Sequence, residues 1–249
     1  MIPKTIHYCW FGGSPLSPEA LKCIASWKKI MPDYEIKRWD ESNFDMDSIP
    51  FTREAYRTGN YAFVSDYARF WILYQHGGIY FDTDVEIIRQ MDDIIGKGAF
   101  LGCEREVQPG RDPELLSVAP GLGMGAEKGN RLCKKMVDLY ESMDFSDDYR
   151  WKMNNTVVKL TTALLVKYGL QNTPEIQTIE GINIYPKEYF CPMDIGSREL
   201  KITPRTRTIH YYSGSWTGNH GKIKSFVKSI LGVKLSKLIV KIKRMAGNG

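Results

Sequence analysis

One stretch constrains the fold of this chain more than any other: Asn60 to Arg89, with the sequence NYAFVSDYARFWILYQHGGIYFDTDVEIIR. Nearly every side chain from Tyr61 to His76 is apolar or aromatic, and a helix that is apolar on all sides belongs inside a domain. Gly77-Gly78 can end such a helix because glycine tolerates a positive φ. The apolar run that follows ends at Asp82-Thr83-Asp84. The stretch therefore predicts a buried helix, a glycine turn and a strand that carries two carboxylates.

Polar side chains interrupt the predicted helix on one side only. At about 100° per residue, Ser65, Asp66 and Arg69 fall within one narrow arc. Asp66 and Arg69 are three residues apart, which is close enough for them to pair. Because a buried ion pair is a weak source of stability, the pair is a candidate functional site. A purely structural ion pair is the alternative.

Asp82 and Asp84 are a candidate metal site. They are two residues apart, so in a strand both side chains point the same way. At a strand end they can face one hard divalent cation, and Mg²⁺ or Mn²⁺ takes carboxylate oxygens together with substrate phosphates. A D-x-D triplet also arises by chance, but the apolar strand and the Asp/Arg helix before it favour a site.

Three segments resemble a known family, the DXD-containing glycosyltransferases. They are the SDYAR run with GGIYFDTDV, the opening IPKTIHYCWFGG and the late IHYYSGSW. This family includes bacterial capsular-polysaccharide glycosyltransferases, the yeast initiating α-1,6-mannosyltransferase and, more distantly, the clostridial glucosylating toxins. The resemblance covers residues 2–216. It implies a GT-A-like, Rossmann-like α/β fold with a mostly parallel central sheet and helical additions.

The resemblance also implies roles for individual residues. Trp10 would stack on the nucleobase of the donor with Tyr8 nearby, although a core aromatic is the alternative for Trp10. His210 would join the metal shell, although a lone histidine is usually structural. The predicted sites are a metal site of Asp82, Asp84 and His210, a catalytic set of Asp66, Arg69 and Asp84, and donor contacts from Tyr8, Trp10, Gly12, Ser65, Asp66, Arg69, Tyr80, Asp82, Thr83, Ser215 and Trp216. The last two would lie on a loop that closes over the diphosphate and excludes water.

The predicted function is metal-dependent transfer of a sugar from a nucleotide-sugar donor to a saccharide or lipid-linked saccharide in bacterial capsular or surface polysaccharide synthesis. Trp10 makes a UDP-sugar the first expectation for the donor and a GDP-sugar the second. The resemblance implies retention of configuration, and we expect front-face substitution because no side chain is placed as a nucleophile. Two alternatives remain. One is a non-catalytic sugar- or cation-binding module, and the other is a metal-dependent phosphohydrolase, although the dehalogenase-type motif would need Thr or Val where Glu86 stands.

The remaining segments predict an α/β domain that opens with a strand, a helix and a second strand. Ser17-Pro18 fits the N-cap and first turn of that opening helix. The glycine-dense segment 120–126 predicts either a closely packed strand or a floor beneath the sugar ring. We expect strands at 5–10, 34–39, 85–88, 100–103, 182–186 and 208–212, helices at 18–31, 51–58, 61–76, 130–143 and 155–168, and a charged loop at 105–114.

The cysteines and the N-terminus indicate a compartment. Five cysteines occur without a C-x-x-C pair or a histidine cluster, so a disulfide framework or a zinc site is not expected. No signal peptide or long apolar span precedes the first strand. We therefore expect a cytoplasmic protein.

The tail differs in charge from the rest of the chain. Residues 222–244 contain eight Lys or Arg and no acid, and removing eight positive charges from the net +5 leaves −3. A mildly acidic body argues against nucleic acid as a partner. We expect a domain at 1–221 and a basic amphipathic tail at 222–249, which packs on the domain or lies on an anionic membrane surface. Its apolar stripe is Ile223, Phe226, Val227, Ile230, Leu231, Leu235, Leu238, Ile239 and Ile242.

Overall fold

The computed structural model describes residues 1–105, 110, 112, 116–194 and 197–213. The chain divides into two compact units, Met1–Tyr212 and Ser213–Gly249. All the strands and helices of the described residues belong to the first unit. The predicted tail at 222–249 and the predicted donor contacts Ser215 and Trp216 lie outside the described residues.

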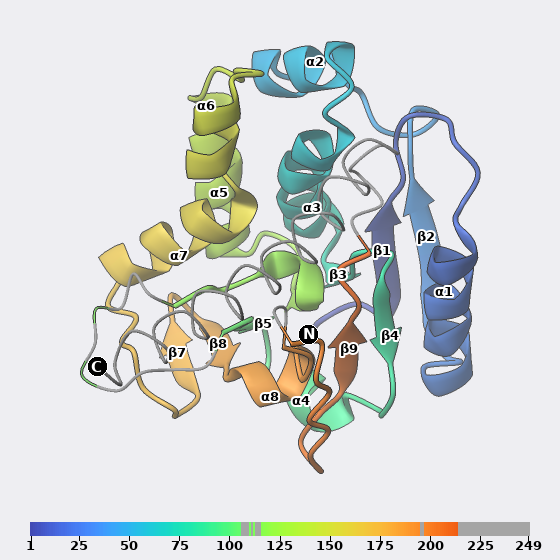
Figure 1. The fold of residues 1–249 in the computed structure, drawn as a ribbon, viewed down its shortest axis with the longest axis vertical. Helices are drawn as coiled ribbons and strands as arrows, with labels where there is room; N and C mark the ends of the chain where they lie inside the picture. Colours follow the sequence, from blue (N-terminus) through green and yellow to red (C-terminus); the bar gives the residue numbers. More distant parts are fainter. Residues whose placement is uncertain (106–109, 111, 113–115, 195–196, 214–249) are drawn as a thin grey trace, which may run out of the picture. The chain divides into compact units, whose positions relative to one another are not determined.

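A seven-stranded sheet in the order β2-β1-β3-β6-β5-β8-β7 organises the first unit (Figure 1). Most of its strands, namely β1, β2, β3, β5 and β8, run in one direction, and β6 and β7 run in the other. The predicted α/β fold with a mostly parallel central sheet is confirmed. The strands are β1 (Thr5–Cys9), β2 (Glu35–Trp39), β3 (Gly78–Tyr80), β5 (Phe100–Gly102), β6 (Met124–Ala126), β7 (Gln177–Ile179) and β8 (Ile182–Tyr185).

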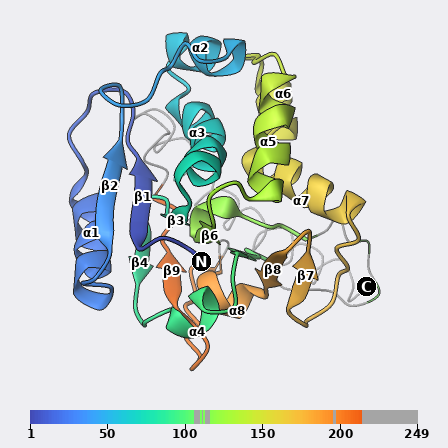
Figure 2. The ribbon, with the colours of Figure 1, turned by 180° about the vertical axis from the view of Figure 1, so that it is seen from behind.

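A second, two-stranded sheet joins parts of the chain that are far apart in sequence. β4 (Val85–Ile87) pairs antiparallel with β9 (Thr208–His210), and Val85 is opposite His210. The two strands lie side by side in both ribbon views (Figures 1 and 2). This pairing holds the segment after the D-x-D triplet against the late histidine.

Helices cover both faces of the large sheet, and each face has its own hydrophobic core. Alternate residues of a strand point to opposite faces, so Tyr8 belongs to one core and Cys9 to the other. Trp27 of α1 lies in the hydrophobic core that contains Tyr8, whereas the buried side chains of α3 lie in the core that contains Cys9. The helices are α1 (Pro18–Ile30), α2 (Pro50–Arg57), α3 (Tyr61–His76), α4 (Asp92–Ile95), α5 (Arg131–Glu141), α6 (Tyr149–Asn154), α7 (Val157–Lys167) and α8 (Lys187–Phe190), with a 3₁₀ turn η2 (Pro120–Leu122).

Most predicted elements occur within one or two residues of their expected ends. Ser17 caps α1, because its side chain accepts a hydrogen bond from the backbone N–H of Ala20 at 3.1 Å. Gly77 ends α3 at a φ of 68°. Helices α4, α6 and α8 and strand β7 were not predicted. The D-x-D triplet also differs from expectation, because it follows β3 in a turn in which Val85 N donates to Asp82 O. A turn, rather than strand alternation, therefore directs the two carboxylates.

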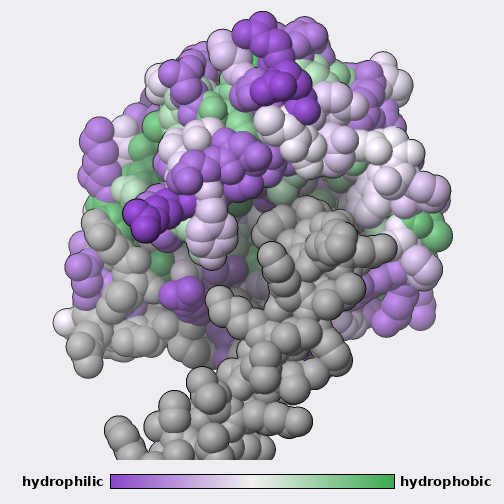
Figure 3. Space-filling model, turned by 45° about the horizontal axis from the view of Figure 1, so that its top comes forward, coloured by the Kyte–Doolittle hydropathy of each residue, from purple (hydrophilic) through white to green (hydrophobic). Residues whose placement is uncertain are grey.

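Figure 3 shows the hydropathy of one face of the molecule. Outside the grey residues, the face seen in Figure 3 is mostly hydrophilic, with hydrophobic side chains in separate small areas. None of the helices among the described residues is long and apolar enough to cross a membrane.

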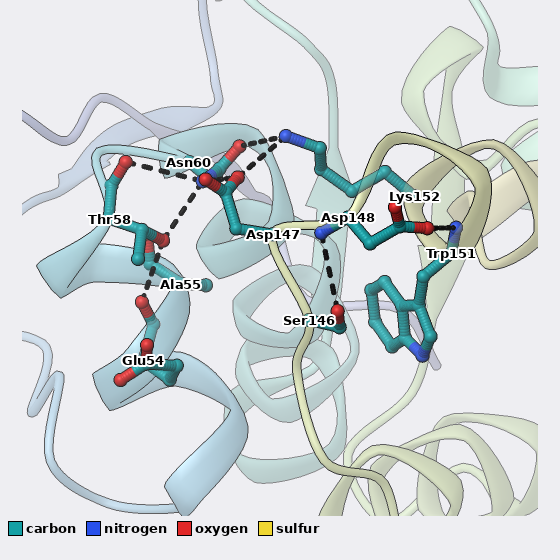
Figure 4. Close-up of polar contacts among 9 residues, drawn as sticks. All are labelled: Glu54, Ala55, Thr58, Asn60, Ser146, Asp147, Asp148, Trp151 and Lys152. Atoms are coloured by element: carbon teal, nitrogen blue, oxygen red, sulfur yellow. Dashed lines mark hydrogen bonds and ion pairs between the residues drawn. The ribbon is translucent and has the colours of Figure 1, made fainter.

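Polar contacts connect the start of α3 to Asp147, which precedes α6, and to Lys152 of α6 (Figure 4). Asn60 Nδ2 donates to Asp147 Oδ1 at 2.8 Å, and Lys152 Nζ lies 2.6 Å from the same oxygen. Asn60 Nδ2 also donates a hydrogen bond to Thr58 Oγ1 at 2.9 Å. These contacts hold in place the helix that carries Asp66 and Arg69.

Candidate functional site

The carboxyl ends of the parallel strands meet at one edge of the sheet, where ligands of open α/β sheets bind. Trp10 follows β1, Asp82 lies two residues after β3, Glu104 lies two residues after β5, and Lys187 lies two residues after β8. Chemically active side chains therefore gather at this edge from segments that are separate in sequence.

Asp82, Asp84 and His210 converge. One ligand atom from each lies within 4.8 Å of the others, and His210 Nε2 is 3.1 Å from Asp84 Oδ1. Ligands about 2.1 Å from a single Mg²⁺ ion are about 3–4.2 Å apart, so small side-chain movements would complete a shell. Within the described part of the chain, the buried Nδ1 of His210 has no hydrogen-bond partner. The three side chains therefore fit a divalent cation.

Gly121 makes room for the carboxylate of Asp82. A Cβ at this position would overlap Asp82 Oδ2, and Asp82 N donates to Gly121 O at 3.0 Å. A glycine in such a segment predicts that another group packs closely against the backbone, but it does not identify that group. The sequence therefore predicts close packing at 120–126 without identifying Asp82 as the neighbour.

Arg69 connects the helix pair to the D-x-D triplet. Its Nη2 lies 2.8 Å from Asp66 Oδ1 and 3.4 Å from Asp82 Oδ1. The guanidinium stands over the ring of Tyr80 at 4.9 Å, and Tyr80 Oη donates to Asp82 Oδ1 at 3.2 Å. Arg69 Nε donates to the backbone oxygen of Ser65 at 3.1 Å. The predicted pairing of Asp66 and Arg69 is present, and it extends to Asp82.

Burial shapes the charges of this group. Asp66 and Arg69 are 7% and 4% exposed. Burial raises the pKa of the Asp66 carboxyl to about 7, against the opposing effect of Arg69. Burial also opposes the charge of Arg69, but the carboxylate of Asp82, then Tyr80 and Asp66, raise its pKa above the usual value. Arg69 is therefore a buried permanent cation beside the candidate metal site.

The remaining predicted donor contacts have different surroundings. Tyr8 is buried with its ring 5.8 Å from that of Trp27. Trp10 is half-buried, and its Nε1 donates to Ser14 O at 2.6 Å. Gly12 adopts a φ of 93° in the turn after β1. Ser65 is half-buried on α3, and Thr83 is buried between the two aspartates. Tyr8 thus contributes to the core, whereas Trp10 keeps an accessible part.

A second group beside His210 was not predicted from the sequence. The ring of Tyr212 lies 4.0 Å from that of His210, and Tyr212 Oη forms a 2.9 Å contact with Cys191 Sγ. Glu104 bonds with Tyr212, and burial raises its pKa despite the opposing effect of His210. The sequence predicted a strand through Tyr212, but β9 ends at His210 and Tyr212 has a φ of 52°, so strand alternation does not place it. Glu104 carried no sequence signal.

The comparison with protein families is decisive for the central segment. Residues 17–101 match the family described as the glycosyltransferase sugar-binding region containing the DXD motif. This segment therefore matches the DXD-containing glycosyltransferases. The predicted resemblance is confirmed, and the chain carries a glycosyltransferase sugar-binding region. The matched segment includes Asp66, Arg69, Asp82 and Asp84, whereas Glu104 and His210 lie beyond it.

Two curated relatives are glycosyltransferases by name. The chain is 32% identical over 109 residues to an uncharacterized glycosyltransferase of Acanthamoeba polyphaga mimivirus, covering 40% of this chain and 42% of that protein. It is 36% identical over 127 residues to inositol phosphoceramide mannosyltransferase 3 of Schizosaccharomyces pombe, covering 48% of this chain and 34% of that protein. The alignments thus span less than half the length of either relative.

Solved glycosyltransferase structures resemble the chain more distantly. The PaToxG glycosyltransferase shares 22% identity with a TM-score of 0.48, over 67% of this chain and 69% of that one. A glycosyltransferase involved in glycosylation of the major capsid of PBCV-1 shares 10% identity with a TM-score of 0.45, over 89% of this chain and 100% of that one.

Proposed function

We propose that this DXD-family chain is a metal-dependent glycosyltransferase that moves a sugar from a nucleotide-sugar donor to a saccharide or lipid-linked saccharide acceptor. The observation that carries the proposal is the convergence of the D-x-D carboxylates with His210 on one side and with the buried Arg69 on the other. An anionic diphosphate requires this combination of a cation site and a fixed positive charge.

Asp82, Asp84 and His210 would hold Mn²⁺ or Mg²⁺, since two carboxylates and an imidazole suit these hard cations. The bound ion would offset negative charge on the departing diphosphate. Asp82 is held for this task by Tyr80 and Arg69 and accommodated by Gly121.

Arg69 would stabilise the diphosphate as the anomeric carbon–oxygen bond breaks, because its charge is already buried and oriented. Asp66 would orient the donor sugar through its hydroxyls. Trp10 would stack on the nucleobase, with a UDP-sugar as the first candidate and a GDP-sugar as the second. Gly12, Ser65, Tyr80 and Thr83 line the route between these groups in this proposal, with Ser215 and Trp216 closing over the donor.

For the stereochemistry we propose retention by front-face substitution, which the family resemblance supports. The bond from the anomeric carbon to the phosphate oxygen breaks. The acceptor oxygen then bonds to the same face of that carbon, and its proton passes to the departing diphosphate.

The proposed setting is bacterial capsular or surface polysaccharide synthesis, in the cytoplasm at the inner face of the cell membrane. Support for a reducing compartment comes from the cysteines, which are buried thiols without a disulfide among them. The basic tail would supply the attraction to the membrane.

Consumption of nucleotide sugars by the purified full-length chain tests the function. UDP- and GDP-sugars are incubated with Mn²⁺, with Mg²⁺ or with a chelator, and release of the nucleotide is followed. We expect one donor to be consumed only when a divalent ion is present. Binding of a nucleotide sugar without turnover would instead indicate a binding module, and hydrolysis of simple phosphate monoesters would indicate a phosphohydrolase.

A further inference from the structure

A cavity beside α8 has no part in the proposed donor site. Its volume is about 460 Å³, within the range of small-molecule sites. It is formed by residues of α8 and of the described segments 191–194 and 197–203. The residues that line it are Lys187, Glu188, Cys191, Pro192, Asp194, Ser197, Glu199, Lys201 and Thr203.

This cavity borders the candidate metal site through shared contacts. Cys191 lines the cavity and lies 2.9 Å from Tyr212 Oη, and the Tyr212 ring lies 4.0 Å from that of His210. Lys187, another lining residue, interacts electrostatically with Glu104, as does His210. Since Lys187 follows β8, the cavity lies at the same carboxyl edge of the sheet as Asp82. Glu104 and Tyr212 therefore neighbour both the cavity lining and His210.

The carboxylates of the lining already have partners. Glu188 Oε1 pairs with Arg205 at 2.9 Å, and Glu199 Oε2 pairs with Lys201 Nζ at 3.8 Å. Asp194 Oδ1 accepts hydrogen bonds from Ser197 N at 2.7 Å and Ser197 Oγ at 2.9 Å. An anionic ligand would meet three carboxylates against two lysines.

Uncharged hydroxyl groups suit this lining better. A sugar hydroxyl donates to a carboxylate and accepts from an ammonium or a hydroxyl group, and the lining offers all three. Pro192 adds a small apolar surface. The mixture of donors, acceptors and apolar carbon matches a saccharide.

We propose that this cavity is the acceptor subsite and that it takes an uncharged saccharide. The assignment rests on the proposed glycosyltransferase function. The saccharide would lie in the cavity beside Glu104 and Tyr212, with one hydroxyl group directed past these two side chains toward the donor sugar at the candidate metal site.

Saturation-transfer NMR on the full-length chain tests the subsite without donor or metal. The probes are the methyl glycosides of glucose, galactose and mannose, with methyl β-glucuronide as the anionic partner of methyl β-glucoside. Glu199→Trp places a large ring in the cavity lining, and Leu200→Trp is the matched control at a neighbouring exposed residue outside that lining. Lys201→Trp, at an exposed side chain, is the second variant if Glu199→Trp does not fold.

We expect an uncharged glycoside to bind the wild type and Leu200→Trp, and the cavity variant to lose about tenfold in affinity, equivalent to about 1.4 kcal/mol. The glucuronide should bind more weakly than the glucoside. Absence of glycoside binding to the wild type, equal binding by the cavity variant, or a glucuronide that binds as tightly as the glucoside would overturn the assignment. Donor consumption is measured separately, so failure of the proposed function is distinguishable from failure of the subsite.

Discussion

Arg69 joins two carboxylates of the candidate site, because one guanidinium contacts both Asp66 and Asp82. A lysine would keep the charge but not the planar group in which Nη2 contacts both carboxylates while Nε donates to Ser65 O. Hydrogen bonds between charged groups contribute about 1.5–3 kcal/mol. We therefore expect Arg69→Lys to lower donor turnover by about 10- to 100-fold.

The measurement is kcat/KM for donor consumption, with Arg57→Lys as the matched control. Arg57 pairs with Glu54 at the exposed surface of α2, and exposed pairs contribute little. Turnover that is the same in Arg69→Lys as in the control would leave Arg69 as a structural residue only.

Gly121 offers a second test at the residue scale. Gly121→Ala would place a methyl group against Asp82 Oδ2, so the carboxylate must move. Groups that orient a metal ligand typically change metal affinity by about 10- to 100-fold when they are mutated, and we expect a loss of this size in Mn²⁺ affinity by calorimetry.

Gly125→Ala is the control for this variant, since its methyl group would overlap the Phe100 ring and not a carboxylate. Both variants should lower the melting temperature. A Mn²⁺ affinity that falls equally in both would contradict a specific effect on Asp82.

At the scale of elements, His7 joins β1 to the end of α3 and to β2. Trp39 Nε1 donates to His7 Nδ1 at 3.1 Å, so Nε2 carries the proton and donates to Gly77 O at 2.9 Å. The imidazole is therefore held neutral. Its pKa is lowered from 6.5 to about 4, chiefly by burial and also by the nearby His76 and Lys37, against the effect of the Gly77 bond.

The buried, neutral His7 predicts that the free energy of unfolding decreases at acidic pH. Because the folded pKa is depressed, the unfolded state binds more protons between pH 6.5 and about 4, and stability falls as the pH falls through that window. The full contribution is about 3 kcal/mol. Urea unfolding at pH 7 and pH 4.5 should show a larger loss of stability in the wild type than in His7→Gln, which cannot titrate. Equal losses would contradict the role of His7.

The sequence could predict the features of helices and strands that depend on local contacts, but not those that depend on distant segments. The ends of α1 and α3 and the pairing of Asp66 with Arg69 depend on neighbours within a few residues, so local patterns were sufficient. The approach of Gly121 to Asp82 and of Glu104 to Tyr212 depends on strand pairing between distant segments. The position of antiparallel β6 between β3 and β5 likewise has no local signal.

At the scale of the whole molecule, the basic tail at 222–244 predicts binding to anionic membranes. Each Lys or Arg near such a surface contributes about 1 kcal/mol, and the attraction falls with salt. The full chain should co-sediment with anionic vesicles at low salt, and a chain that ends at Gly221 should not. Equal binding to neutral vesicles, or no loss on truncation, would leave packing on the domain as the role of the tail.

Sugar transfer by the whole molecule depends, in this proposal, on a cation held by the D-x-D carboxylates and His210. Asp84→Asn is the sharpest test, because the amide keeps the shape of the side chain and removes the charge that lies 3.1 Å from His210. Asp138→Asn, at an exposed pair with Lys134 on α5, is the matched control. We predict that Mn²⁺-dependent donor consumption falls by about 100-fold in Asp84→Asn and stays at the wild-type rate in the control. A wild-type rate with the same dependence on Mn²⁺ in Asp84→Asn would contradict the proposed cation site.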